Sequence, residues 1–387
     1  MNRLRILLVL AALAATVFCF YLWQTTRPGP LRLRQVEFSD LPGWRDAGLD
    51  AALASFARGC TVLAAKTPAT PMGGKGYGGT AADWLSVCNA AHGEARDFFE
   101  KNFIPYQVSA GGAQAGLFTG YYEPLIRASH ERHGAYQTPV YGLPPDLVRV
   151  DLSLFNPRFA GEHISGRLDG HRLVPFATRA EIDAHGVANT KILFWCDDPV
   201  ALFFLQIQGS GRVSLDDGSI ERIAYAGENG RPYTAIGRIL IEDGVLTSQN
   251  VSLASIRAWL KQNPARAQAV MEADQSFIFF EEKPVGDASL GSAGTLGAAL
   301  TPRASMAIDP RLNVLGAPYY VDAAPVRALL IAQDTGGAIR GPVRGDVFFG
   351  FGDRAEEDAG GMKAHGDLYV LLPMALAHSL GAEKDFP

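Results

Sequence analysis

The chain has 387 residues and a formal net charge of −5, with 48% hydrophobic and 19% charged residues. This length is enough to bury a large core and favours two domains. The mildly acidic balance, without a long basic run, argues against non-specific binding of nucleic acid, which depends on neutralising phosphates. Four cysteines exclude both a disulfide-dense scaffold and a four-cysteine zinc ribbon.

Residues 1–30 predict export from the cytoplasm or attachment to a membrane. Two arginines precede an uncharged apolar stretch at residues 6–23, which is typical of a cleaved secretory signal or a retained N-terminal anchor. The arginines would stay cytoplasmic and the rest of the chain would lie outside. Cys19 also suggests lipid attachment, although Phe18 before it is bulkier than the usual lipidation signal allows.

The next two segments predict amphipathic helices, each with a cysteine on its apolar stripe. Apolar residues recur every three or four positions over residues 49–63 and again over residues 84–98. If the two helices pack together, Cys60 and Cys88 face each other, and an oxidising compartment would let them form a disulfide. Two buried free thiols are the alternative.

The remaining elements alternate between strand and helix patterns. Residues 117–244 are rich in strand signals, with apolar runs at 191–195 and 202–208 and a predicted hairpin turn at Asp217-Gly218. Helix patterns return, and strands then resume to the end of the chain, where their punctuation by glycine, proline and aspartate favours a barrel or sandwich. The predicted helices are residues 252–260 and 264–271, and the later strands are residues 277–280, 306–308, 327–332, 347–351 and 368–372.

Three carboxylates are candidates for acid–base chemistry. Asp309 and Asp334 each follow an apolar strand, and Asp346 precedes one. Partial burial at such a position can raise the pKa of a carboxyl group toward the value that a general acid needs. The alternative is ordinary capping of strands and turns. Asp334-Thr335-Gly336 also matches the aspartic protease signature, but those enzymes need two such sequences and this chain has one.

A polar segment at residues 206–212 is a candidate for sugar binding. Strand alternation would place Gln206 and Gln208 on one face, beside exposed backbone at Gly209 and Gly211. Amides both donate and accept, so they suit a ligand with hydroxyl and acetamido groups, whereas a plain polar edge strand is the alternative. The eight histidines show no spacing that completes a zinc site, so we expect no metal ion.

Five ordered segments together resemble the membrane-bound lytic murein transglycosylase A family of bacterial cell-wall enzymes. The C-terminal part also resembles the three-aspartate module, whose namesakes would be Asp309, Asp334 and Asp346. The five segments are residues 118–124 (FTGYYEP), 206–211 (QIQGSG), 225–230 (YAGENG), 233–237 (YTAIG) and 334–341 (DTGGAIRG).

The resemblance implies a mainly β fold with helices, of the α+β class. A double-psi β-barrel domain would comprise residues 31–116 and 245–387. Residues 117–244 would form an inserted second barrel-like β-domain, with a groove between the two domains. The implied partner is the peptidoglycan glycan strand, on the periplasmic side of the envelope, with membrane or outer-membrane attachment, no nucleic acid and no cofactor.

The family cleaves the β-1,4 bond between N-acetylmuramic acid and N-acetylglucosamine without water and forms a 1,6-anhydromuramyl product. One aspartate suffices, since the muramyl 6-hydroxyl replaces the water that an ordinary glycosidase activates with a second carboxylate. By motif match Asp346 would be acid and then base, and Asp334, or Asp334 together with Asp309, would position it or raise its pKa. The implied substrate-binding residues are Thr119, Tyr121, Gln206, Gln208, Gly209, Ser210, Tyr225, Asp309, Thr335 and Gly336.

Two other functions stay open at this point. A glycoside hydrolase would use Asp334 and Asp346 as a catalytic pair and would incorporate water into its product. An expansin-like protein would bind or loosen the wall without cleaving it. The aspartates distinguish these functions, because the exposed amides and tyrosines fit both binding and catalysis.

Overall fold

The computed structural model describes residues 31–111, 115–159 and 162–386. The predicted signal or anchor at residues 1–30 lies outside these ranges. Within them, none of the helices combines the length and the apolar character that a membrane crossing requires.

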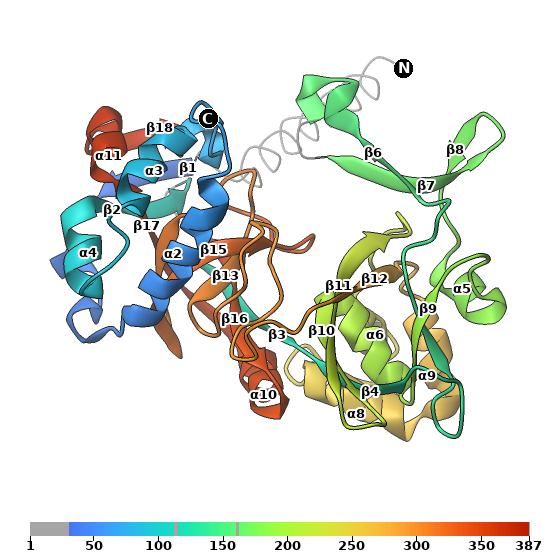
Figure 1. The fold of residues 1–387 in the computed structure, drawn as a ribbon. Coiled ribbons are helices and arrows are strands. Elements are labelled where there is room, and N and C mark those ends of the chain that lie inside the picture. Colours follow the sequence, from blue (N-terminus) through green and yellow to red (C-terminus); the bar gives the residue numbers. More distant parts are fainter. Residues whose placement is uncertain (1–30, 112–114, 160–161, 387) are drawn as a thin grey trace, which may run out of the picture.

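The larger of two main sheets closes into a barrel (Figure 1). Its first and sixth strands, β14 and β17, also pair with each other, so six strands form a closed ring and three more extend it. In spatial order the described strands are β14 (Pro318–Ala323), β15 (Val326–Thr335), β13 (Ser305–Ile308), β16 (Arg344–Phe351), β3 (Gly116–Glu123), β17 (Lys363–Pro373), β2 (Phe103–Ala110), β1 (Leu31–Gln35) and β18 (Glu383–Phe386).

Helices from both ends of the described chain contact this barrel sheet. They bury an aromatic cluster in which the ring centroids of Phe56, Phe98, Phe99 and Phe103 lie 5.0–6.4 Å apart. Aromatic side chains remove large apolar areas from water, so this cluster anchors the helices on the sheet. The helices are α2 (Asp50–Leu63), α3 (Ala81–Cys88), α4 (Ala95–Asn102), α10 (Asp353–Gly361) and α11 (Met374–Leu380).

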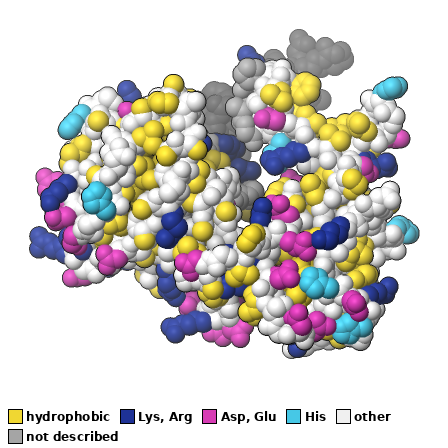
Figure 2. All heavy atoms as spheres, viewed as in Figure 1, with side chains coloured by type: hydrophobic (Ala, Val, Ile, Leu, Met, Phe, Trp, Pro, Cys, Tyr) yellow, Lys and Arg dark blue, Asp and Glu magenta, His cyan; other side chains and the backbone are white. Residues whose placement is uncertain are grey.

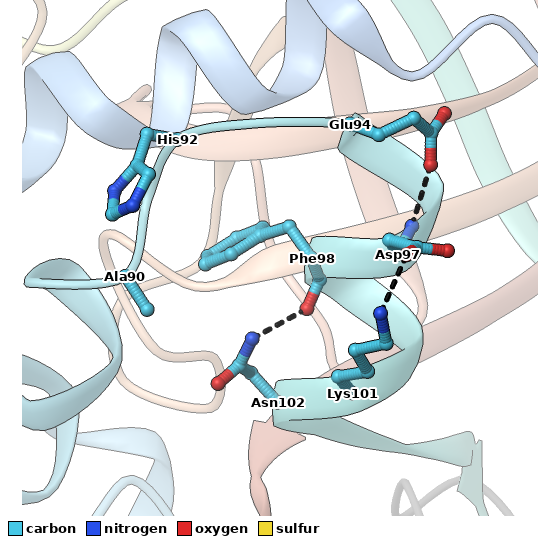
Figure 3. Close-up of a pocket in the computed structure, with 7 residues that line it drawn as sticks. All are labelled: Ala90, His92, Glu94, Asp97, Phe98, Lys101 and Asn102. Carbon is cyan, nitrogen blue, oxygen red and sulfur yellow. Dashed lines mark hydrogen bonds and ion pairs between the residues drawn. The ribbon is translucent and has the colours of Figure 1, made fainter.

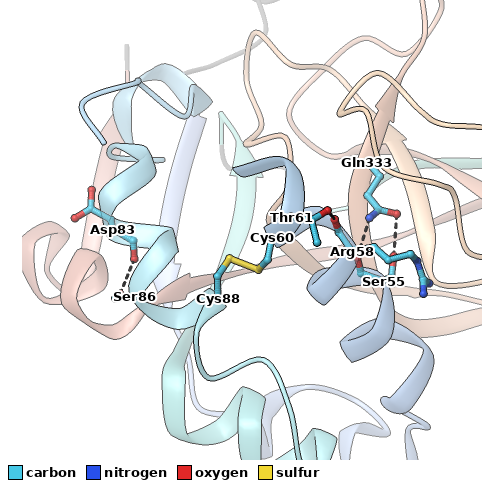
Figure 4. Close-up of a disulfide and its surroundings, with 8 residues drawn as sticks. All are labelled: Ser55, Arg58, Cys60, Thr61, Asp83, Ser86, Cys88 and Gln333. Atoms are coloured by element: carbon cyan, nitrogen blue, oxygen red, sulfur yellow. Dashed lines mark hydrogen bonds between the residues drawn. A yellow bond between two sulfur atoms is a disulfide. The ribbon is translucent and has the colours of Figure 1, made fainter. Parts of the chain in front are cut away.

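A disulfide joins α2 to α3. The sulfur atoms of Cys60 and Cys88 lie 2.04 Å apart, as the two cysteine-bearing stripes predicted (Figure 4). The prediction of one continuous helix over residues 84–98 was wrong, however, because α3 ends at Cys88 and α4 begins at Ala95. Gly93 between them has a φ of +88°, which interrupts helical geometry, and Glu94 then caps α4 by accepting a backbone N–H.

The second main sheet is built from the middle of the chain. Its edge strands approach each other through an isolated bridge between Gly142 and Phe280, so the sheet curls toward a barrel. The turn at Asp217-Gly218 joins β10 to β11 as predicted. In spatial order the strands are β12 (Ile278–Lys283), β11 (Ile220–Glu228), β10 (Ser210–Leu215), β4 (Leu125–Ser129), β9 (Ile192–Cys196) and β5 (Thr138–Tyr141).

The predicted strand at residues 202–208 was wrong, since this segment belongs to helix α6 (Pro199–Gln208). Asp198 caps the helix by accepting two backbone N–H groups, and Gly209 ends it in the left-handed conformation. The helix lies between the second sheet and other helices and is apolar on most sides, so its helical period is hidden in the sequence.

The remaining described elements flank the second sheet. Helices α7 (Ile236–Glu242), α8 (Leu253–Gln262) and α9 (Pro264–Glu272) share an apolar cluster with α6, which confirms the two helices predicted after residue 250. The others are helix α5 (Arg179–His185) and the small sheet β6 (Val148–Asp151), β7 (His163–Asp169) and β8 (Arg172–Val174).

The fold class is the expected one, but the boundaries at residues 117 and 244 do not coincide with sheet membership. β3, which begins at Gly116, belongs to the barrel sheet, and the chain crosses to the second sheet only at Pro124. Helices α7–α9 pack with α6, and β12 pairs with β11, so the chain returns only after Lys283.

Candidate active site

Asp334 and Asp346 lie on either side of one barrel residue. β13 runs between β15 and β16, and its Ala307 pairs with Asp334 on one neighbour and with Asp346 on the other. On the far side of β16, Asp346 pairs in turn with Thr119 of β3. Two strands that follow each other in the sequence, β15 and β16, and the distant strand β3 therefore bring two carboxylates and a hydroxyl to one level of the barrel.

Asp346 is partly buried and is held through one of its two oxygens. The hydroxyl of Thr119 donates to Oδ1 at 2.6 Å and accepts from Nη2 of Arg344 at 2.8 Å. Burial raises the pKa of Asp346 above its usual range, the Thr119 hydrogen bond and the charge of Arg344 partly oppose that rise, and the charge of Asp334 adds to it. Within the described residues, Oδ2 of Asp346 accepts no hydrogen bond.

Asp334 is held through both oxygens. Its Oδ1 accepts from the backbone N–H and the hydroxyl of Thr295 and from the N–H of Thr335, each at 2.9 Å, and its Oδ2 accepts from Tyr121 at 3.0 Å. Burial raises the pKa of Asp334, although these donors oppose the rise. The two carboxylates thus differ in how much of their surface is free for a ligand.

Asp309 has a different role from the other two aspartates. Its side chain is fully buried and accepts from Arg311 at 2.9 and 2.7 Å and from the N–H of Gly341 at 2.9 Å. Burial alone would raise the pKa of Asp309, but these donors hold it below the usual range. The carboxylate ties the segment after β13 to the loop between β15 and β16, and its burial contradicts the expected contact with substrate.

Two more of the predicted residues belong to the same place. The ring of Tyr121 contacts Phe348 at 5.2 Å between centroids, and burial beside Asp334 and Asp346 raises the pKa of its hydroxyl well above the usual value. The hydroxyl of Thr335 lies 2.9 Å from that of Thr295, and Gly336 follows it in the chain. Thr119, Tyr121 and Thr335 therefore surround the two carboxylates.

The amides do not join this cluster. Because residues 206–208 are helical, the two glutamines do not share a face. Gln206 is buried, and its Oε1 accepts from Arg179. Oε1 of Gln208 accepts from the backbone N–H of Tyr122 at 3.4 Å. Gly209 and Ser210 form the junction between α6 and β10.

Tyr225 lies on the second sheet, on β11, with 37% of its surface exposed. It lines a cavity of about 470 Å³ at the seam between the edge strands, where Lys191 and Glu282 form an ion pair of 2.8 Å. The full lining consists of Gly142, Leu143, Lys191, Leu193, Tyr225, Ala226, Phe280, Glu281 and Glu282.

A smaller cavity, of about 270 Å³, lies at the turn between α3 and α4 (Figure 3). Three of its charged groups bind one another along α4: Glu94 accepts from the N–H of Asp97, and Lys101 pairs with the Asp97 carboxylate at 2.5 Å. They offer no arrangement for catalysis.

Two residues at the site were not predicted. Thr295 lies in an irregular segment without periodic signal, so nothing in the sequence marks it. Arg344 could have been found, because it lies two positions before Asp346 on one strand, and alternation places such residues on the same face.

Charge on the visible surface agrees with the composition. Cationic and anionic side chains are interspersed over the face in Figure 2, so the described residues form no basic stripe there of the kind that tracks nucleic acid.

Comparison with known proteins gives consistent matches over most of the chain. Residues 117–281 match the MltA specific insert domain, and residues 304–372 match the 3D domain. The membrane-bound lytic murein transglycosylase A of Vibrio cholerae is 33% identical over 279 residues, 68% of each chain.

Solved structures share the fold as well. The membrane-bound lytic murein transglycosylase of Agrobacterium tumefaciens matches with a TM-score of 0.79 and 31% identity, over 90% of this chain and 99% of that chain. Escherichia coli MltA with bound chitohexaose matches with a TM-score of 0.65 and 26% identity, over 90% and 95% of the two chains. The chain belongs to the membrane-bound lytic murein transglycosylase A family.

Proposed function

We propose that this protein is a peptidoglycan lytic transglycosylase in which Asp346 is the single acid and base. The observation that carries the proposal is the unequal hydrogen bonding of the two carboxylates. Both oxygens of Asp334 accept from protein groups, whereas Oδ2 of Asp346 accepts from none of the described residues. A carboxyl oxygen without a protein partner is available to the glycosidic oxygen, and a raised pKa favours its protonated form.

The proposed reaction needs one proton carrier. Protonated Asp346 gives its proton to the glycosidic oxygen while the bond from that oxygen to C1 of N-acetylmuramic acid breaks, and N-acetylglucosamine leaves with a free 4-hydroxyl. The muramyl 6-hydroxyl then bonds to C1 and gives its proton to the Asp346 carboxylate. The acid is restored, no water is consumed, and the product is a 1,6-anhydro sugar.

Asp334 supports this reaction without taking part in proton transfer. Its four hydrogen bonds, three to Oδ1 and one to Oδ2, make it less available than Asp346 to activate water or to attack the sugar, as the second carboxylate of a hydrolase must. Its negative charge beside Asp346 raises the pKa of that group. This arrangement favours the transglycosylase over the two-carboxylate hydrolase.

The proposed substrate site is a groove between two domains, one built on the barrel sheet and the other on the second sheet. The Escherichia coli relative was solved with bound chitohexaose, which supports an oligosaccharide site in this fold. We further propose that the protein works on the periplasmic side of the envelope, carried there by residues 1–30. The relatives are named membrane-bound enzymes, which supports that location.

Product analysis tests the proposal. Purified sacculi are digested in water enriched in oxygen-18, and the released muropeptides are weighed. We expect anhydromuramyl ends without the heavy isotope, and Asp346→Asn as the inactive control. Labelled reducing ends would identify a hydrolase, and glycan binding without released muropeptides would identify a wall-binding protein.

A further inference from the structure

We propose that Glu123 is a positioning residue, which fixes the second sheet against the strands that carry Asp346 and Thr119. This inference rests on the proposed function, because a glycan strand that contacts both sheets requires them at a fixed angle. It assigns a task to the motif at residues 206–211, which the chemistry at Asp346 does not use, and a second task to the motif at residues 118–124, which also supplies Thr119.

Glu123 is a buried charge at the junction of the two sheets. It is the last residue of β3, it is 1% exposed, and its Oε2 lies 3.1 Å from Nε of Arg212 on β10. Its Oε1 lies 3.4 Å from Nε of Arg222 on β11 and accepts from the hydroxyl of Ser292 at 2.6 Å. Both arginines are also buried. Removing one partner of such a group leaves uncompensated buried charge, so the group resists displacement.

The same group touches both strands that form the active site. In the pairing of β3 with β16, Thr119 lies opposite Asp346 at one end and Glu123 lies opposite Phe351 at the other. The guanidinium carbon of Arg212 lies 3.4 Å from the centroid of the Phe351 ring. Arg212 therefore contacts the C-terminal ends of β3 and β16. Thr119 and the proposed acid, Asp346, lie nearer the N-terminal ends of the same two strands.

The two arginines also hold the chain where it returns from the second sheet. Nη2 of Arg212 donates to the carbonyls of Ala288 and Leu290 at 2.8 and 3.1 Å. Arg222 donates to the carbonyls of Val285 and Leu290 at 2.8 and 2.7 Å. Glu123 thus fixes the outgoing strand directly and the returning segment through both arginines.

The motif at residues 206–212 completes this junction. The N–H of Arg212 donates to the carbonyl of Pro124 at 2.8 Å. This bond holds β10 against the residue at which the chain crosses from the barrel sheet to the second sheet. At Gly211 a Cβ atom would lie 2.0 Å from Cδ1 of Leu205 and 2.9 Å from the carbonyl oxygen of Pro124, so only glycine fits. Close packing of β10 against α6 and Pro124 explains this glycine without any contact to sugar.

The test variant is Glu123→Gln in the full-length protein, which keeps the shape of the side chain and removes its charge. With soluble glycan strands as substrate, we expect KM to rise about tenfold, because the loss of one charged hydrogen bond weakens binding by about that factor. We expect kcat to change less than threefold. The pH profile of kcat should keep its shape, because no group around Asp346 is altered. Hydrogen exchange should become faster in residues 284–292.

Two further variants separate positioning from general damage. Glu123→Gln combined with Arg222→Gln restores the net charge of the buried group but also removes the bonds from Arg222 to the carbonyls of Val285 and Leu290, so hydrogen exchange in residues 284–292 should be faster than in Glu123→Gln alone. Ser292→Ala removes the one hydrogen bond to Oε1 of Glu123 and keeps every charge of the group, and should raise KM about threefold even if Glu123→Gln does not fold. The matched control is Glu221→Gln, next to Arg222 on β11 but partly exposed beside His130, which should behave as wild type.

The outcomes are decisive. A folded Glu123→Gln protein with the wild-type KM, or with the wild-type exchange rate in residues 284–292, would overturn the proposal. If Glu123→Gln does not fold, a wild-type KM for Ser292→Ala would overturn it. Failure of the proposed function looks different, because the wild-type protein itself would then release no anhydromuramyl product, whereas the exchange readout does not depend on the chemistry.

Discussion

Thr119 and Asp346 are joined by a hydrogen bond of 2.6 Å whose direction is fixed by a third group. Arg344 can only donate, so the hydroxyl of Thr119 must accept from it and turn its own proton toward Oδ1 of Asp346. Oδ1 is then an acceptor, and the acidic proton of Asp346 resides on Oδ2. The arrangement directs the proton to the oxygen that has no partner among the described residues.

Thr119→Val should therefore lower kcat about tenfold, because it removes the donor that places the proton on Oδ2. It also removes a hydrogen bond that lowers the pKa of Asp346, so the pKa rises and the basic limb of the pH–rate profile moves to higher pH. Measurement of kcat against pH checks both effects. Thr119→Ser keeps the hydroxyl and should stay near wild type; equal losses in the two variants would refute a role for the donor.

Asp346→Asn should reduce turnover about 1,000-fold, since an amide can neither donate the proton nor receive it from the 6-hydroxyl. The folded structure should persist, because its only hydrogen bond among the described side chains is with Thr119. Muropeptide analysis and circular dichroism are the measurements. Substantial activity in this variant would transfer the acid role to Asp334.

Asp334→Asn should shift the pH profile in the direction opposite to Thr119→Val. Loss of the neighbouring negative charge lowers the pKa of Asp346, so the basic limb moves to lower pH and less of the acid is protonated at neutral pH. Rates measured from pH 4 to 8 show the direction of the shift. An unmoved basic limb would mean that the two carboxylates do not interact.

Asp309→Asn should destabilise the protein by about 2 kcal/mol at neutral pH, because it weakens buried bonds from Arg311 and Gly341. The pKa of Asp309 is lowered in the folded state. Its contribution to stability is therefore present above the unfolded pKa of about 3.9 and is lost as pH falls through the folded value. Denaturation in urea at pH 7 and at pH 3 should show a gap between variant and wild type that narrows in acid.

Reduction of the disulfide, or Cys60→Ala with Cys88→Ala, should cost about 3–4 kcal/mol of stability, from the chain entropy of a loop closed across 28 residues. The activity of the remaining folded molecules should be unchanged, because α2 and α3 supply none of the hydrogen bonds to Asp334 or Asp346. Thermal melts with and without reductant provide the measurement. An unchanged melting temperature would show that the bond does not constrain the chain.

The carboxylate site could be predicted because its strands are buried and end at polar residues. An apolar run that stops at Asp334, or starts at Asp346, marks a strand end in the sequence itself. The disulfide was predictable for a similar reason, since each cysteine continues a helical stripe. Periodicity carries information wherever one face is buried and the other is not.

The errors occurred where that contrast is missing. Helix α6 is surrounded by the second sheet and by α8 and α9, so its apolar run has no polar face, and such a run predicts a buried strand as readily as a helix. A strand at residues 202–208 would place Gln206 and Gln208 on one face, where both could contact a sugar. In the helix, Gln206 is buried and accepts a hydrogen bond from Arg179. Thr295 reaches Asp334 from a segment without regular structure, where local sequence does not determine tertiary contacts.

In the described residues the chain passes between the two sheets at two places, and their positions determine from which side a polymer could enter the space between the sheets. The outgoing chain crosses at Pro124, next to Glu123, and the returning chain passes Leu290, whose carbonyl accepts from the two arginines that pair with Glu123. If the glycan occupies the proposed groove, it would meet no other chain crossing among the described residues, so it could be laid in sideways and would not have to be threaded from a terminus. Such lateral entry suits a cross-linked wall, in which most strands offer the enzyme their flanks and few offer their ends.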